Sequence, residues 1–374
     1  MIYTFFVKLF IKIVNKLHLS RFICIIVKPF IHEIIGNDKN DIIVAKEFLQ
    51  NIYKNPQNSC ICTTKRNNIE YDLQIIIPAY NTAKFIEKCV DSVLSLQTSY
   101  NIIITVVDDG SKDNTCIVLK KYEFDSRVEV IKQENRGYSG ARNRALDNIK
   151  ARYITFLDSD DEFLNNVEID KLLSFIENND IDILECGYIT FNDIKDIQIV
   201  QHKDIISNNV NKLLYGFPWG KIYKAELFSH IHFPEEYWFE DTVMSFIIFP
   251  MCKTVATSSM LLYHYRINPN GITSKSRGKI KSLDTYWITE QLLADRATLG
   301  LHNDKDFAEV MLQQIKMNYK RIRYLDNNNI DRAVFVLTAD LWNKHFHDLN
   351  LNSKLAKALI HHNFLQYRLL LELN

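Results

Sequence analysis

Short apolar runs alternate with segments of helical periodicity along the first half of the chain. Runs rich in Ile, Val and Phe predict buried strands over residues 73–77, 102–107, 128–131 and 153–157. Between them, apolar residues recur three or four positions apart and predict helices over residues 82–96, 115–122 and 139–149. The first strand is expected to stop at Pro78, which lacks the N–H that a sheet needs. This alternation predicts an α/β fold, in which helices cover both faces of a parallel sheet.

The two ends of the chain have different patterns. Within residues 1–35, an apolar helical face lies beside a basic stripe of Lys8, Lys12 and Lys16. No uncharged stretch there approaches the roughly 18 residues that a membrane span needs. Two interpretations remain: a helix lying on an anionic membrane surface, or a helix packed on the protein with its lysines in water. Residues 37–70 are polar and predict a connector with one short helix, and the pattern from about residue 280 is helical.

Charge and cysteine content narrow the choice of partners and compartment. The 374-residue chain has 45 basic and 45 acidic residues, so its formal net charge is zero. A neutral chain is not expected to bind nucleic acid in bulk. The seven cysteines lack the paired spacing of a zinc site or a disulfide framework. They are therefore expected to be reduced thiols in a cytoplasmic protein.

An acidic tetrapeptide directly follows the fourth predicted strand. It contains Asp158, Ser159, Asp160 and Asp161. Hard cations such as Mg²⁺ and Mn²⁺ prefer carboxylate oxygens and share them with substrate phosphates. The tetrapeptide taken alone favours a polar turn that caps the next helix over a metal site. In parallel sheets, ligands bind beyond the carboxyl ends of the strands, which is where these acids lie.

Four segments in order carry a family resemblance. They read IIIPAYN at residues 75–81, VVDDGS at 106–111, NRGYSGARN at 135–143 and FLDSDD at 156–161. This set closely resembles the family 2 glycosyltransferases over roughly residues 72–275. The resemblance implies a GT-A fold, a Rossmann-like mixed sheet flanked by helices. It also implies a nucleotide-sugar donor, for which UDP is the usual nucleotide.

The resemblance implies a role for residues in the first half. Pro78, Ala79 and Tyr80 correspond to the turn that cradles the base. Asp109 corresponds to the acid that accepts the imide N–H of uracil, with Asp108 as the second choice. The remaining implied contacts with the nucleotide sugar are Asn135, Arg142, Asp158 and Ser159. Asp160 corresponds to the last acid of the D-x-D motif, a direct ligand of Mn²⁺ or Mg²⁺.

The second half is implied to carry the acceptor side. An inverting transfer is a single displacement, so a base must take the proton of the acceptor hydroxyl on the face opposite the leaving group. Asp241 corresponds to that base, with Glu240 as the second choice. His264 is implied to complete the metal shell, because neutral imidazole is a competent ligand. Arg266 is implied to face the diphosphate, whose geometry guanidinium matches.

The expected function is therefore transfer of a sugar, with inversion, to a hydroxyl of a glycan or lipid-linked glycan. The resemblance favours synthesis of a bacterial capsule, lipopolysaccharide or other surface polysaccharide. It places the protein in the cytoplasm, with peripheral contact at the inner face of the plasma membrane through residues 1–35. The expected organisation is an N-terminal extension, a nucleotide-binding half, an acceptor half and a helical C-terminal region, over residues 1–70, 71–165, 166–275 and 276–374.

Three alternatives make different demands on the sequence. A dinucleotide-binding dehydrogenase needs a glycine-rich turn after the first strand, and residues 78–81 contain no glycine. A sugar-phosphate nucleotidyltransferase would show a basic, glycine-rich loop early in the chain, and none is found. A catalytically inactive nucleotide-sugar-binding protein would lack acids that are present here at positions 109, 160 and 241. The donor sugar, the acceptor and the choice between Mn²⁺ and Mg²⁺ stay open.

Overall fold

The computed structural model describes residues 39–372 apart from 64–67, 193, 211–212 and 269–275. Residues 1–35, for which a membrane-surface helix is one prediction, lie outside the described residues. The chain divides into two compact units. One is Asn55–His302, and the other is formed by the described residues before and after it. None of the helices in the described ranges has the length and apolar character required to cross a bilayer.

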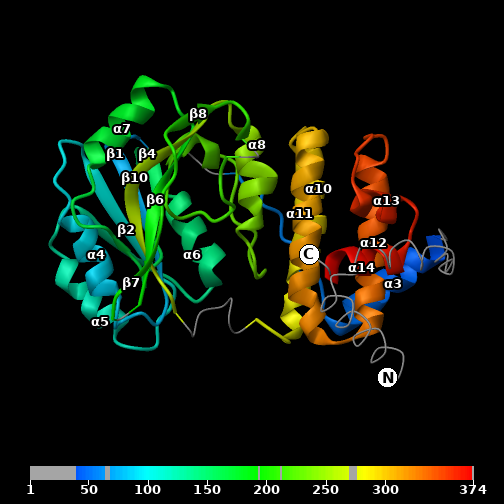
Figure 1. Ribbon diagram of the computed structural model, residues 1–374. Helices are drawn as coiled ribbons and strands as arrows, with labels where there is room; N and C mark the ends of the chain where they lie inside the picture. Colours follow the sequence, from blue (N-terminus) through cyan, green and yellow to red (C-terminus); the bar gives the residue numbers. More distant parts are fainter. Residues whose placement is uncertain (1–38, 64–67, 193, 211–212, 269–275, 373–374) are drawn as a thin grey trace. The chain divides into compact units, whose positions relative to one another are not determined.

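The Asn55–His302 unit is built on one mixed sheet of ten strands (Figure 1). The strands are β1 Tyr71–Ala79, β2 Ile102–Asp108, β3 Val128–Lys132, β4 Ala151–Phe156, β5 Glu162–Phe163, β6 Ile183–Phe191, β7 Asp196–Val200, β8 Ile205–Ser207, β9 Lys221–Lys224 and β10 Val255–Arg266. Their order is β3-β2-β1-β4-β9-β6-β10-β5, with β7 beside β6 and β8 beside β10. The first four are parallel, whereas β9 is antiparallel to both β4 and β6. The mixed α/β fold that the resemblance implied is thus confirmed.

Helices connect and cover this sheet. They are α4 Ile86–Leu94, α5 Thr115–Leu119, α6 Gly137–Leu146, α7 Ile169–Asn178, α8 Phe249–Met251 and α10 Asp284–Thr298. Short turns of other helix types are the 3₁₀ segments Lys120–Tyr122, Ala225–Phe228 and Ile280–Leu283 and the π-helix Met244–Ile248. The three helices between the parallel strands were predicted from their spacing. Helices α4 and α6 lie on opposite sides of the sheet (Figure 1), as right-handed crossovers require when the strand order reverses at β1.

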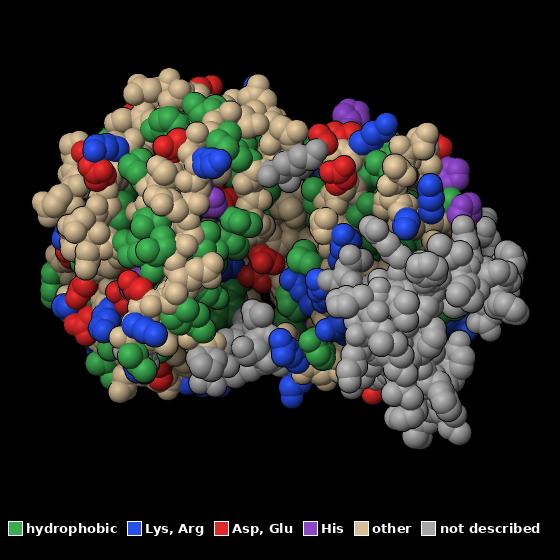
Figure 2. Space-filling model, in the orientation of Figure 1, with side chains coloured by type: hydrophobic (Ala, Val, Ile, Leu, Met, Phe, Trp, Pro, Cys, Tyr) green, Lys and Arg blue, Asp and Glu red, His purple; other side chains and the backbone are tan. Residues whose placement is uncertain are grey.

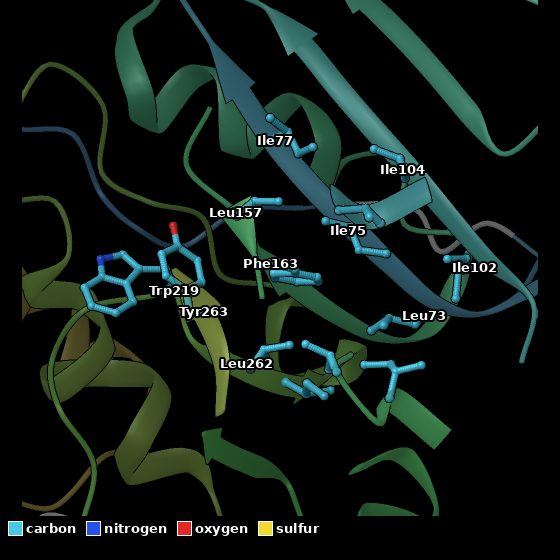
Figure 3. Packing of buried hydrophobic residues seen from close by; sticks show 14 of the residues in the cluster. Leu73, Ile75, Ile77, Ile102, Ile104, Leu157, Phe163, Trp219, Leu262 and Tyr263 are labelled. Atoms are coloured by element: carbon cyan, nitrogen blue, oxygen red, sulfur yellow. The ribbon is translucent and has the colours of Figure 1, made fainter. Parts of the chain in front are cut away.

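Every second residue of β1 packs against the helices that cover one face of the sheet. Leu73, Ile75 and Ile77 belong to one apolar cluster with Ile86 of α4 and Leu172 of α7. All five side chains are fully buried. Figure 3 shows Leu73, Ile75 and Ile77 within this cluster. The continuous burial of the strand, rather than a polar-apolar alternation, is what a sheet covered on both faces demands.

The prediction that the first strand stops at Pro78 is wrong. β1 continues to Ala79, and Pro78 pairs with Val107 of β2. On its other side, the pairing of β1 with β4 ends at Ile76 opposite Phe156. Proline is tolerated here because one neighbour has already left the strand, so the missing N–H does not interrupt a ladder.

The second unit is helical. Its helices are α3 Lys39–Ile52, α11 Lys305–Ile322, α12 Asn328–Phe346, α13 Lys354–Ile360 and α14 Phe364–Glu372, with a 3₁₀ turn at Arg323–Leu325. Side chains of Asp304, Asn327 and Ser353 accept backbone N–H groups at the starts of α11, α12 and α13. Such caps satisfy donors that a helix leaves unpaired, which explains where these helices begin. The helical character predicted beyond residue 280 is confirmed for the described residues.

Candidate active site

A pocket of about 290 Å³ lies beyond the carboxyl ends of β1 and β2. Six of the residues implied to act on substrate line it: Pro78, Ala79, Tyr80, Asp109, Asn135 and Glu240. Further aromatic side chains in the wall are Tyr138, Tyr237, Trp238 and Phe239. A concave site with apolar walls and a few converging polar groups is typical of a small-molecule site.

Asp109 ties the end of β2 to the start of α6. Its carboxylate accepts hydrogen bonds from the backbone N–H groups of Arg136 and Gly137, both at 2.8 Å, and from the side chain of Gln133 at 2.7 Å. The Asn135 side chain donates to the Asp109 carbonyl oxygen at 2.9 Å. An ionised carboxylate has about four acceptor positions, so three bonds leave room for one further donor. Asp109 therefore shapes the pocket and retains the capacity to accept a ligand N–H.

The turn after Asp109 requires glycine. Gly110 has a φ of +72°, and a Cβ added there would lie 3.1 Å from the backbone nitrogen of Asn135 and 3.2 Å from the carbonyl oxygen of Gln133. L-residues rarely adopt that φ, and the neighbouring backbone leaves no space for a side chain. Gly110 is thus what allows the segment before α6 to approach β2 and meet Asp109.

Arg142 connects the two halves of the site. Its guanidinium donates to Asp158 at 3.0 Å and to Glu240 at 2.7 Å, and the Arg142 side chain is 5% exposed. Burial alone would lower the pKa of Arg142, but the two carboxylates outweigh burial and raise it. The guanidinium is therefore permanently charged, and it holds the Glu240 side chain against the D-x-D loop.

Asp241 follows Glu240 where the chain turns into the π-helix Met244–Ile248. Its carbonyl oxygen accepts the Met244 N–H at 2.9 Å, and the residue is half-buried. Just upstream, Glu236 and Phe239 have positive φ values of 69° and 66°. Non-glycine residues held in that region cost about 1–3 kcal/mol each and concentrate at functional sites. The strained segment before Asp241 lines the pocket, so the backbone strain lies where the acceptor base was expected.

The D-x-D loop is held by the end of β10. The Tyr263 hydroxyl accepts the Asp158 N–H at 3.0 Å and donates to the Asp161 carboxylate at 2.7 Å. Asp161 also accepts the backbone N–H of Arg266 at 2.6 Å. Burial, and then Asp158 and Asp160, raise the pKa of Asp161 well above its usual value. The sequence interpretation missed Asp161, although a third acid directly after the motif was the available signal.

Asp160 lies in the same loop and is partly shielded from water. Its carboxylate accepts a hydrogen bond from the Asn268 side chain at 3.0 Å. Burial raises the pKa of Asp160, the Asn268 donor opposes that rise, and the charge of Asp158 adds to it. Ser159 between the two acids is buried. The loop is therefore rich in carboxylate oxygens.

His264 and Arg266 lie on β10 but face other partners. The His264 ring nitrogen lies 2.9 Å from an Asp196 carboxylate oxygen, and the ring stacks on Phe191 at 3.6 Å. Arg266 donates to the Asp160 carbonyl oxygen at 2.7 Å and lies 3.1 Å from a Glu162 carboxylate oxygen. Within the described part of the chain, no three or more His, Cys, Asp or Glu side chains are grouped to hold a metal ion. The roles of His264 as metal ligand and Arg266 as diphosphate contact stay predictions.

Comparison with known proteins agrees with this architecture. The Glycosyl transferase family 2 domain matches residues 74–234. Glycosyltransferase GlyA of Streptococcus pneumoniae serotype 4 is 30% identical over 223 residues, which are 55% of this chain and 32% of the relative. The putative teichuronic acid biosynthesis glycosyltransferase TuaG of Bacillus subtilis is 40% identical over 106 residues, 28% of this chain and 41% of TuaG. The chain thus spans less than half the length of each of these two relatives.

A solved structure matches most of the chain. The crystal structure of S. aureus TarS 1–349 in complex with UDP-GlcNAc covers 79% of this chain and 89% of its own, with a TM-score of 0.52 and 18% identity. At that identity, the similarity establishes the fold. Residues 74–234, which the family 2 domain matches, contain most of β1, all of β2 and β4, and the D-x-D loop. Residues 74–234 therefore match the Glycosyl transferase family 2 domain, and the chain has the GT-A fold.

Proposed function

We propose that this protein transfers a sugar, with inversion, from a UDP-sugar to a hydroxyl of a glycan or lipid-linked glycan in surface-polysaccharide synthesis. The observation that carries the proposal is the Arg142 bridge, which joins Asp158 of the D-x-D loop to Glu240 of the predicted acceptor half. It brings Glu240, which directly precedes the proposed base Asp241, to the pocket and next to the acids expected near the diphosphate. Similarity to TuaG, whose name refers to teichuronic acid biosynthesis, supports the surface-polysaccharide part of the proposal.

The proposed chemistry is a single displacement. Asp241 takes the proton of the acceptor hydroxyl, whose oxygen then bonds to the anomeric carbon. The bond between that carbon and the diphosphate oxygen breaks, and the electron pair leaves with the nucleoside diphosphate. Glu240, whose carboxylate accepts a hydrogen bond from Arg142, is the second candidate for the base.

Mn²⁺ or Mg²⁺ is the proposed cofactor. Burial, and then the charge of the neighbouring acids, raise the pKa of Asp160 and Asp161, and a bound cation would favour their ionised forms. Asp160 would hold the ion together with phosphate oxygens, as hard cations prefer. When bound, the ion would stabilise negative charge on the departing diphosphate.

A donor screen tests the proposal. The protein is incubated with Mn²⁺ or Mg²⁺, a panel of UDP-sugars and an oligosaccharide or polyprenyl-linked glycan acceptor, and nucleotide release is measured. We expect UDP as product and loss of at least 100-fold in turnover for Asp241→Asn, since general-base catalysis contributes about 10²–10⁴-fold. Asp348→Asn is the control, because that side chain is fully exposed and lies in the helical unit. Release of pyrophosphate from a nucleoside triphosphate would instead identify a nucleotidyltransferase.

Membrane attachment through residues 1–35 is a separate part of the proposal. Lipid-linked acceptors lie at a membrane surface, where the basic stripe of Lys8, Lys12 and Lys16 would meet anionic headgroups. We expect the full chain to sediment with phosphatidylserine vesicles and a chain lacking residues 1–35 to stay in solution. Equal sedimentation of both proteins would exclude this role.

A further inference from the structure

Five aromatic side chains from two segments form a continuous stack beside the D-x-D loop. We call Tyr215, Phe217, Trp219, Tyr263 and Tyr265 the aromatic stack. The ring centroids of Tyr215 and Phe217 are 5.5 Å apart, and those of Phe217 and Trp219 are 3.8 Å apart. Trp219 also stacks on Tyr263 at 4.7 Å and on Tyr265 at 4.9 Å. Figure 3 shows the indole of Trp219 beside Tyr263.

The inner end of the stack contacts the D-x-D loop. The Tyr263 hydroxyl hydrogen-bonds both Asp158 and Asp161. Burial, and then the charges of Asp161, Asp158 and Asp160 in the same loop, raise the pKa of Tyr265 to about 12. The stack therefore begins next to the acids that the proposed reaction uses.

The outer end of the stack reaches solvent. Exposure rises from Trp219, which is 9% exposed, to Tyr215, which is 50% exposed. Gly216 between the stacked Tyr215 and Phe217 is exposed as well, so no side chain from that position covers the rings. An aromatic face thus extends outward from the reaction centre and ends in water.

A buried ion pair holds this outer end in place. One carboxylate oxygen of Glu185 accepts the Tyr215 N–H at 2.9 Å and lies 3.3 Å from the ammonium nitrogen of Lys221. Lys221 donates to the Phe217 carbonyl oxygen at 2.8 Å and lies 4.0 Å from the centre of its ring. Both charged side chains are fully buried. Moving such charges out of water is costly, and here the ion pair fixes the backbone of a tyrosine whose ring remains half exposed.

We propose that the outer end of the aromatic stack is a subsite for the acceptor glycan, in which a pyranose ring packs on Tyr215 one or more sugars from the reacting hydroxyl. The C–H groups on one face of a pyranose present an apolar surface that matches an aromatic ring. The donor has its own pocket, and no member of the stack lines it. The stack leads from the D-x-D loop to the surface, the path that a glycan needs if its end reacts and the rest remains in solvent. This inference rests on the proposed function for its direction of transfer.

The test measures sugar binding and nucleotide binding on the same samples. Cellotetraose, chitotetraose and maltotetraose are titrated by saturation-transfer NMR in the presence of UDP and Mn²⁺, and UDP is titrated separately. The variants are Tyr215→Ala, Tyr215→Phe, which keeps the ring, and Phe124→Ala as control. Phe124 is 94% exposed and precedes β3, at the amino ends of the parallel strands.

We expect at least one oligosaccharide to bind and Tyr215→Ala to weaken it roughly 3- to 10-fold, the range of one aromatic contact. Tyr215→Phe and Phe124→Ala should leave sugar binding unchanged, and all variants should bind UDP as the wild type does. Equal sugar binding by Tyr215→Ala, or absence of sugar binding by the wild type, would overturn the subsite. Sugar binding that depends on Tyr215 without any UDP binding would support the subsite and contradict the proposed function.

Discussion

Replacing Arg142 by Met tests whether the bridge between the two halves of the site is energetically important. Its guanidinium makes two charge-assisted hydrogen bonds, at 2.7 Å to Glu240 and 3.0 Å to Asp158. Removing one partner of a buried pair costs about 3–5 kcal/mol, because the remaining charges lose their counter-charge. The two carboxylate side chains are 18% and 24% exposed, so water partly compensates them. We therefore expect a loss of about 3 kcal/mol in the free energy of unfolding, the lower end of that range.

Urea denaturation of the full chain measures this loss, with the slope against denaturant compared between proteins. Arg127→Met is the matched control, because Arg127 pairs with Asp125 at the surface and is 47% exposed. Surface pairs contribute about 0–1 kcal/mol, so the control should change little. Arg142→Lys should recover only part of the loss, since a single ammonium does not reproduce the forked geometry. A loss under 1 kcal/mol for Arg142→Met would refute the argument that this bridge holds the site together.

Three further changes have expected outcomes. Because the pKa of Asp161 is raised in the folded state, its ionisation makes the fold less stable as pH rises above the usual aspartate value. Asp161→Asn should therefore gain stability relative to the wild type between pH 4 and pH 7 in thermal melts; a constant difference across that range would contradict this. Gly110→Ala should lower stability by about 1–3 kcal/mol and weaken UDP binding, because its Cβ would crowd Asn135. Gly300→Ala, at a φ of +68° with open space around it, should bind UDP as the wild type does. If Gly110→Ala and Gly300→Ala bind UDP with equal affinity, crowding at Asn135 is excluded as the cause. EDTA should abolish UDP release, and Mn²⁺ or Mg²⁺ should restore it. Full activity of Asp160→Asn would exclude Asp160 as the metal ligand.

The parallel half of the fold could be predicted because its signals are local. The runs that became β1, β2, β3 and β4 are apolar and β-branched, and α4 buries one regular face formed by Ile86, Cys89, Val90 and Val93. The strands β5, β7 and β8 gave no such signal. They have only two to five residues, and β7 and β8 are mostly exposed, so their position depends on pairing with β10 and β6.

The candidate site shows the same division between local and long-range information. Motifs that directly follow predicted strands in the sequence placed Tyr80, Asp109 and Asp160 near the strand ends. The pairing of Arg142 with Glu240, 98 residues away, follows from tertiary packing and has no local pattern. For the same reason the sequence could not show that His264 pairs with Asp196, a residue on a short exposed strand.

The continuous sheet limits how this enzyme domain can move. Strand β9 hydrogen-bonds β4 on one side and β6 on the other, so the predicted nucleotide-binding and acceptor halves share one backbone ladder. A hinge between them would have to break interstrand bonds, which makes the distance between these two halves a fixed property of the scaffold. Under the proposed function, adjustment to different sugars would therefore fall to the connecting loops, which can vary while the sheet stays the same.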